Sequence, residues 1–270
     1  SLVPRKILQN AVAFSSTGMH TAIIVGPAIG GFLYFLGPDV VYLICTVLIL
    51  SSVILTFFIT YQHKKVTTKM NVNELFAGIN FIWRNKTLLG AISLDLFAVL
   101  LGGATALLPI YAKDILNVGP EGLGILRAAP AVGALICALF IAQWPMKTKV
   151  GKKLFFAVGV FGISMLVFGI STSFIVSVVA LVLAGAADSF SVVIRMTLIQ
   201  LETPDAMRGR VSSVNAIFIG ASNELGEFES GATAELFGPV GSIVFGSLGT
   251  ILVVLVWAKT FPNLLNREKL

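Results

Sequence analysis

The chain alternates between long apolar segments and short polar connections. Eight segments are long enough to cross a bilayer as helices, since a crossing needs about 20 apolar residues. They lie near residues 9–36, 40–61, 87–110, 123–143, 154–171, 174–200, 211–236 and 240–260. The connections after the first, fifth and seventh segments are very short, so the helices that they join must be antiparallel neighbours. The pattern therefore predicts an all-α, polytopic membrane helix bundle.

The composition agrees with this interpretation. Hydrophobic residues make up 56% and charged residues 12% of the chain, whereas soluble globular domains average about 25% charged residues. If both chain ends are placed in the cytoplasm, sixteen of the 19 basic residues fall in inner segments, as the positive-inside rule requires. Lys113 then lies outside, and Arg127 and Arg195 fall within segments. We therefore expect a multi-pass membrane protein with both ends of this chain in the cytoplasm.

The longest inner connection, residues 62–86, carries a pattern of its own. Asn71 followed by Glu74 resembles a capping box, with Asn in place of Ser or Thr. The apolar residues around it recur at helical spacing, namely Val72, Leu75, Phe76, Ile79 and Ile82. This pattern predicts an amphipathic helix on the inner membrane surface. The alternative is a linker helix that only tethers two parts of the protein.

The two ends of the chain resemble each other. LVPRKILQNAV at residues 2–12 aligns with LETPDAMRGRV at residues 201–211, so the first predicted helix matches the seventh. A repeat of six helices is the period of a protein built from two six-helix halves. The expected parts are residues 1–61 as the last two helices of an N-terminal half, residues 62–86 as a cytoplasmic linker, and residues 87–270 as the six-helix C-terminal half.

Glycines and a proline interrupt the first apolar segment. In AIIVGPAIGGFLYFLGP, residues 22–38, they are Gly26, Pro27, Gly30 and Gly31. Small residues allow a neighbouring helix to approach closely, and a proline kinks a helix within a bundle. The motif resembles the fifth-helix antiporter motif of the major facilitator superfamily. The resemblance implies that this helix seals the transport path in one state and that transport is export; tight packing alone is the alternative.

A loop near the middle of the chain resembles the same superfamily. WPMKTKVGKKLFF at residues 144–156 is similar to its Gly-x-x-x-Asp-Arg-x-Gly-Arg-Lys loop, of which Gly151, Lys152 and Lys153 remain. The acidic residue of that loop is absent, so gating by a charge relay is not implied here. A positively charged anchor on the inner side is the alternative interpretation.

Longer stretches are similar to one branch of the superfamily, the enterobactin exporters and related drug and macrolide efflux proteins. These stretches are residues 88–116, 122–135 and 203–231, the last of which includes the inner-loop residues Arg208 and Arg210. The resemblance implies proton-coupled export of a small organic molecule, such as a catecholate siderophore. Multidrug or macrolide efflux is the alternative that the same branch implies.

Ionisable residues inside predicted helices are costly and usually face a cavity or a partner. The candidates for transport and proton coupling are Asp95, Asp188, Arg195, Glu224 and Glu227. At about 1.5 Å per residue, the depths of Asp95 and Arg195 permit an ion pair between their helices. A carboxylate in such surroundings can exchange a proton, which a proton-driven exporter requires. The alternative is that these acids only pair with Arg195 or support packing.

The carboxylates of the seventh segment fall on two faces of its helix. Glu224, Glu227 and Glu235 share one face at about 100° per residue, whereas Glu229 points elsewhere. One of these faces is expected to line a cavity and the other to pack against neighbouring helices. The sequence leaves open which is which.

No metal-ligand cluster, catalytic triad or phosphate-binding loop is present in the sequence. We therefore expect a protein that is not an enzyme, without metal, cofactor or nucleic-acid partner. The expected partners are the lipid bilayer, a small-molecule substrate and protons as the coupling ion. Four helices missing from the N-terminal half would be needed for a complete transporter. Two rival hypotheses are a membrane scaffold without transport activity and a truncated, inactive remnant of a transporter.

Overall fold

The computed structural model describes residues 22, 26, 29–31, 33, 34, 36–58, 72–103, 105–143 and 148–268. All regular elements within these ranges are helices. The chain divides into two compact units. The first unit comprises Ser1–Lys69 and Val118–Ala128, and the second comprises Met70–Asn117 and Ala129–Leu270.

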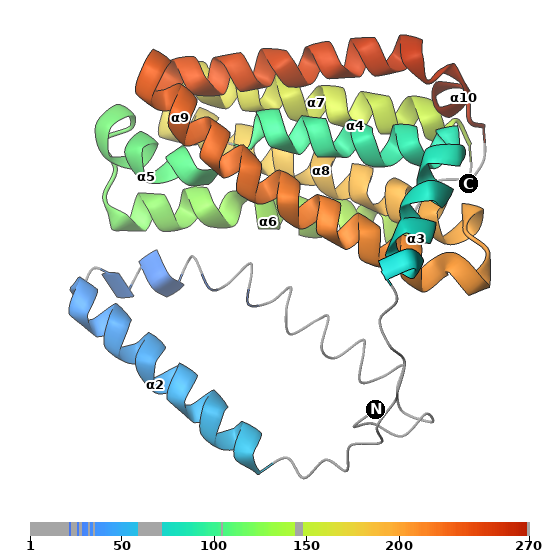
Figure 1. The fold of residues 1–270 in the computed structure, drawn as a ribbon. Coiled ribbons are helices and arrows are strands. Elements are labelled where there is room, and N and C mark those ends of the chain that lie inside the picture. The colour runs from blue at the N-terminus through green and yellow to red at the C-terminus, as the bar shows by residue number, and fades with distance from the viewer. Residues whose placement is uncertain are drawn as a thin grey trace. The chain divides into compact units, whose positions relative to one another are not determined.

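The order of the elements follows the predicted order of spans (Figure 1). They are α2 (Pro38–Phe57), α3 (Val72–Arg84), α4 (Lys86–Gly102), η2 (Thr105–Leu107), α5 (Leu108–Ile110), η3 (Tyr111–Ile115), α6 (Pro120–Gln143), α7 (Val150–Ile170), α8 (Phe174–Glu202), α9 (Asp205–Thr260) and α10 (Pro262–Leu265). Six described helical stretches are long and apolar enough to cross a membrane. These six stretches correspond to the last seven predicted spans, because the single helix α9 contains the two spans 211–236 and 240–260. The first predicted span, residues 9–36, lies mostly outside the described residues.

The helix α2 of the first unit begins at a sharp turn. Gly37 has a φ of 114°, a left-handed conformation that glycine adopts without strain. Pro38 follows as the first helical residue, where a backbone N–H would have no partner within the helix. Asp39 lies in the first turn, where the helix dipole favours a negative charge. The Gly-Pro-Asp link thus ends one predicted span and starts the next.

The prediction of a helix over residues 87–110 is wrong in one respect, because this helix is not continuous. The helix α4 ends at a pair of glycines, and the chain continues through η2, α5 and the π-helical turn η3. The α9 helix satisfies the backbone at this break. Its Ser230 hydroxyl donates to the carbonyl of Gly103 (2.7 Å), and its Thr250 hydroxyl donates to the carbonyl of Ala98 (3.2 Å). Irregular backbone at membrane depth is tolerated where protein groups satisfy it in this way.

The long helix α9 consists of two antiparallel arms. Gly238 has a φ of 74°, which interrupts the helical conformation directly before Pro239. The chain reverses direction there, as the sharp corner of α9 shows (Figure 1). The two arms are the predicted spans 211–236 and 240–260.

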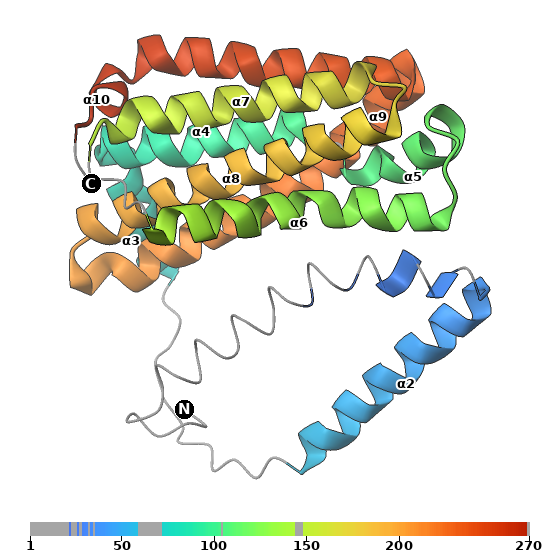
Figure 2. The same cartoon turned by 180° about the vertical axis from the view of Figure 1, so that it is seen from behind.

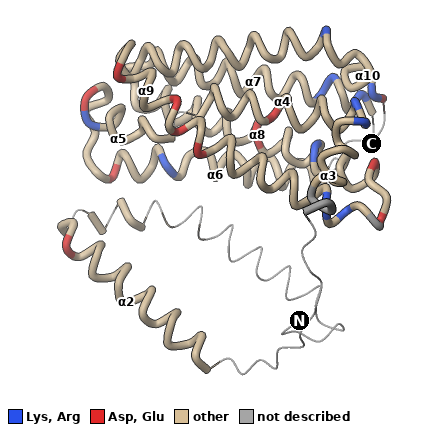
Figure 3. The backbone as a smooth tube through the Cα atoms, viewed as in Figure 1, with Lys and Arg blue, Asp and Glu red and all other residues tan. Residues whose placement is uncertain are grey.

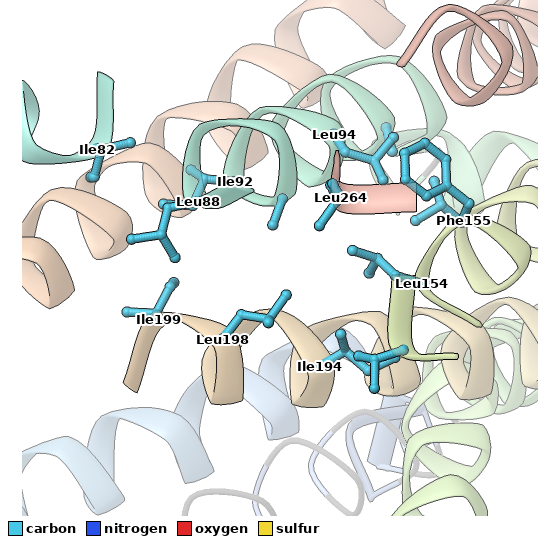
Figure 4. Close-up of a cluster of buried hydrophobic side chains, with 14 of the residues drawn as sticks. Ile82, Leu88, Ile92, Leu94, Leu154, Phe155, Ile194, Leu198, Ile199 and Leu264 are labelled. Atoms are coloured by element: carbon cyan, nitrogen blue, oxygen red, sulfur yellow. The ribbon is translucent and has the colours of Figure 1, made fainter. Parts of the chain in front are cut away.

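A buried apolar cluster holds the second unit together at one end. Figure 4 shows side chains of α4 and α8 pointing toward each other, with Leu88 opposite Leu198 and Ile199. Leu154 of α7 and Leu264 of the short α10 enter the same cluster. None of these five side chains is more than 1% exposed. Because α10 contributes a core residue, the C-terminal segment belongs to the folded unit.

Basic residues of the second unit gather at the end of the bundle where α3 and α10 lie (Figure 3). Arg84 ends α3, Lys152 lies in the first turn of α7, and Arg208 lies in the first turn of α9. The described inner segments of the second unit that carry Arg84, Lys152 and Arg208 therefore lie at a common end. That this end faces the cytoplasm stays a prediction.

Candidate functional site

A buried ion pair joins α4 to α8. The Nη1 atom of Arg195 lies 2.6 Å from Oδ2 of Asp95, and the two side chains are 3% and 7% exposed, respectively. A buried charge is very costly unless it is paired, so each side chain requires the other. The depths inferred from the sequence permit this pair, and the structure contains it.

Asp188 and Ser191 extend this pair along α8. With Arg195 they occupy positions i, i+3 and i+7, which lie on one face of a helix. They line a cavity of about 10 Å³ together with Asp95, Ala98, Val99, Val158, Phe161 and Ala187. A volume of about this size accommodates one water molecule. We call Asp95, Asp188, Ser191 and Arg195 the α4–α8 cluster.

Ser191 is a member of the α4–α8 cluster that the sequence analysis missed. It is 2% exposed, and its hydroxyl has no hydrogen-bond partner among the described residues. Its position four residues before Arg195, on the same helix face, is a signal that could have identified it. Most buried polar groups have a hydrogen-bond partner, so the Ser191 hydroxyl beside this cavity is free to bind a water molecule or another polar group.

The charges of the α4–α8 cluster do not cancel when both carboxylates are ionised. Asp188 lies within the electrostatic influence of both Asp95 and Arg195. Two carboxylates and one guanidinium leave one negative charge in excess, which is costly in apolar surroundings. A single proton on a carboxylate would neutralise the cluster and still leave Arg195 with an ionised partner. The arrangement can therefore hold or release one proton.

The two acidic faces of α9 have different surroundings in the second unit. Glu224, Glu227 and Glu235 are exposed, and none of them lines the α4–α8 cavity. Glu229 is half-buried with Oε1 inside, and Ser222 on the same side is 2% exposed. The Glu229 face is therefore the one that packs against the bundle. Of the four predicted proton carriers, the structure brings together Asp95 and Asp188 and leaves Glu224 and Glu227 on a separate, open face.

The structure describes three residues of the motif found in the first segment, Gly26, Gly30 and Gly31, all of them helical. Pro27 lies outside the described residues. A β-carbon added at Gly26 or Gly30 would meet no atom within 4 Å, whereas one at Gly31 would lie 2.9 Å from the Cα of Gly124 in the same unit. Close helix approach thus explains Gly31, and the sealing role of the motif stays a prediction.

Gly151 of the predicted loop motif contacts the C-terminal segment. Its N–H donates to the carbonyl of Arg267 (3.0 Å), and a β-carbon there would overlap the carbonyl oxygen of Leu264. Lys152 is exposed and Lys153 is half-buried. The glycine therefore allows α10 to pack directly on the start of α7.

An acidic residue that the sequence analysis did not single out, Glu202, supports the same end of the bundle. Its carboxylate accepts from Arg267 (2.5 Å) and from the amide of Asn85 (3.3 Å), which caps α4. Arg208 pairs with Asp205 at 2.6 Å on the surface. Arg210, the other predicted loop residue, is half-buried in the first turns of α9.

Replacing Gly151 by alanine is expected to displace α10 from α7. The added methyl group collides with backbone atoms that cannot move aside individually, and overpacking of this kind costs about 1–3 kcal/mol. Limited proteolysis with trypsin should then cleave near Arg267 faster than in the parent protein. Lys152→Ala, at the exposed neighbouring position, serves as the control. Equal cleavage rates for the two variants would contradict the contact.

Apolar helices around a charged cluster in which Asp95 and Arg195 are buried and Asp188 is half-buried define a multi-pass membrane protein with a polar site inside its helix bundle. The sequence profile of the Major Facilitator Superfamily matches residues 1–227. The chain belongs to this superfamily of transporters.

Several curated relatives are similar to the chain at low identity. The enterobactin exporter EntS of Citrobacter koseri is 27% identical over 188 residues, covering 68% of the chain and 44% of that exporter. The exporter of the same name from Escherichia coli O1:K1 is 24% identical over 257 residues, covering 94% and 61%. A Na(+), Li(+), K(+)/H(+) antiporter of Planococcus maritimus is 24% identical over 239 residues, covering 77% and 56%. The chain thus spans between 44% and 61% of these relatives.

Proposed function

We propose that the protein exports a small organic molecule across a bacterial inner membrane by proton-coupled alternating access. The substrate class that we favour is a catecholate siderophore, because two of the relatives are named enterobactin exporters. Complete transport activity would require the four N-terminal helices expected before this chain, since relatives of the same superfamily are longer. Multidrug or macrolide efflux remains the alternative within the same class.

The observation that carries this proposal is the α4–α8 cluster. Charged groups within membrane helices are rare and mark substrate or proton pathways more often than structural sites. A purely structural ion pair would need only Asp95 and Arg195, whose opposite charges already compensate each other. Asp188 adds an unmatched negative charge beside them, and Ser191 adds an unpaired hydroxyl. Both features suit a site that binds and releases a proton.

Proton binding at this cluster would change how α4 and α8 interact. With Asp188 ionised, Arg195 is attracted to two carboxylates, and with Asp188 protonated it is attracted mainly to Asp95. These two arrangements favour different contacts between the helices, which is the requirement for a ligand to shift a conformational equilibrium. The transported molecule would enter on the open side of α9, where Glu224 and Glu227 are exposed.

A second candidate is exchange of a monovalent cation for protons. The exposed carboxylates of α9 form an acidic face that would favour a cationic substrate over an anionic one. One relative is named a Na(+), Li(+), K(+)/H(+) antiporter. Transport of sodium or potassium by the purified protein would favour this candidate over siderophore export.

The decisive experiment uses the full-length transporter in vesicles that contain a pH-sensitive dye. Addition of enterobactin, a macrolide or sodium should produce proton movement for the true substrate only. Asp188→Asn should abolish this movement and leave expression unchanged, because an amide cannot carry the proton. Asp205→Asn, at an exposed position in the first turn of α9, is the matched control and should behave as the parent protein.

Substrate-dependent proton movement retained in Asp188→Asn would contradict the assignment of the proton to Asp188. If Asp95→Asn, Glu224→Gln and Glu227→Gln retained it as well, none of the four predicted carboxylates would be the proton carrier. Substrate export without any proton movement in the parent protein would leave the exporter proposal intact and contradict the coupling.

A further inference from the structure

The helix α3 has one face that the second unit covers and one that it leaves open. Ile82 is 1% exposed, and Gly78 approaches the backbone of α9 so closely that a β-carbon would lie 3.1 Å from the carbonyl oxygen of Arg210. This contact fixes the rotation of α3 about its own axis. The opposite side cannot turn inward without breaking it.

We infer that the open side of α3 is a binding surface for anionic phospholipids at the inner membrane surface. This side, the α3 outer face, comprises Phe76, Asn80 and Trp83 at positions i, i+4 and i+7. Arg84 ends α3, and Lys86 begins α4 two residues later. Phe76 is 60% and Trp83 is 65% exposed. Two large aromatic side chains on one face of a helix form an apolar surface that favours burial.

The direction of α3 fits a membrane surface. Figures 1 and 2 show α3 running across the ends of the long helices of the second unit, not along them. If those helices cross the membrane, α3 lies roughly in the membrane plane. Amphipathic helices in this position bury their apolar face by about 5–10 Å at the boundary between headgroups and acyl chains. Tryptophan is enriched at this level of the bilayer.

The charge around α3 selects the class of lipid. Arg84, the last residue of α3, and Lys86, the first residue of α4, are exposed, and basic residues gather at the end of the bundle where α3 lies (Figure 3). Basic residues near the surface are attracted to the anionic lipids of the inner leaflet. Phosphatidylglycerol should therefore bind better than the zwitterionic phosphatidylcholine.

The shape of the α3 outer face also favours a flexible lipid over a ligand of rigid shape. Phe76, Ala77, Ile79, Asn80 and Trp83 line a shallow, open depression. Flexible acyl chains and headgroups can fill such a surface without a matching rigid shape. This inference does not depend on the transported substrate or on proton coupling.

The test places a nitroxide label at Asn80→Cys of the full-length transporter in a cysteine-free background. Vesicles contain phosphatidylcholine with or without phosphatidylglycerol. In the presence of phosphatidylglycerol, we expect the label to collide with oxygen several-fold more than with a water-soluble nickel complex. A label at Glu268→Cys, exposed at the same end of the bundle, is the control and should favour the nickel complex.

Three outcomes would overturn the inference. A label at position 80 that behaves like the one at position 268 would place the α3 outer face in water. A label protected from both reagents would show that another part of the protein covers it. Equal accessibility in the two lipid mixtures would contradict selection of anionic lipid.

Two variants separate the contributions to binding. Trp83→Ser should move the label at position 80 toward water in both lipid mixtures, because it removes apolar surface. The double variant Arg84→Gln and Lys86→Gln should remove the difference between the two mixtures. All three side chains are exposed, so the fold should tolerate these changes, and unchanged accessibility would argue against the corresponding contribution.

Discussion

Replacing Arg195 by methionine is expected to destabilise the helix bundle by about 3–5 kcal/mol, the usual cost of leaving a buried charge without its partner. Because methionine fills a similar volume, the loss of stability measures the effect of the missing positive charge and not that of a cavity. Asp95 then remains at 7% exposure with no cation to compensate it. The measurement is thermal or denaturant unfolding of the purified full-length transporter in detergent.

The double variant Asp95→Leu with Arg195→Met tests the origin of this cost. Apolar residues of similar volume often replace a buried ion pair without loss of stability, so the double variant should recover most of what the single variant loses. Arg208→Met is the matched control, because Arg208 pairs with Asp205 on the surface and such pairs contribute about 0–1 kcal/mol. If Arg195→Met were no more damaging than Arg208→Met, the charge at the pair would not be buried as described.

The second large effect is expected where α6 crosses α8. A β-carbon at Gly185 would overlap the carbonyl of Pro130, and one at Gly133 would overlap the carbonyl of Val182. Two backbones approach here without side chains between them, the arrangement that small residues permit in membrane bundles. Gly185→Ala and Gly133→Ala should each cost about 1–3 kcal/mol, because the two helices must separate.

A third glycine provides the control for this pair of substitutions. Gly159 lies within α7, and a β-carbon added there would meet no atom within 4 Å. Alanine favours the helix over glycine by about 1 kcal/mol, so Gly159→Ala should leave stability unchanged or raise it. Unfolding of the three variants measures the difference. Equal stability of Gly185→Ala and Gly159→Ala would show that α6 and α8 are not in direct backbone contact.

Several features of the second unit could be predicted because they depend on local sequence. The length of an apolar segment predicts a membrane-spanning helix. The helices α7 and α8 confirm this for the predicted ranges 154–171 and 174–200. The constant rise of a helix converts sequence position into depth. This is why Asp95 and Arg195 could be recognised as possible partners before their helices were known to touch.

Other features required contacts between segments far apart in the chain. The break after α4 is stable because Ser230 and Thr250 of α9 donate to its carbonyls. Gly151 is required because α10 packs against it. Neither partner lies near its target in sequence, so neither local propensity nor periodicity indicates the contact.

Chain length, hydropathy and the spacing of charges were sufficient to recognise a membrane helix bundle and to identify its intramembrane charges, because these properties follow from the bilayer and from the geometry of one helix. They could not orient each helix about its axis. That rotation depends on which neighbours a helix packs against. It places Asp188 and Ser191 beside the ion pair, buries the Glu229 side of α9 and leaves Glu224 and Glu227 exposed.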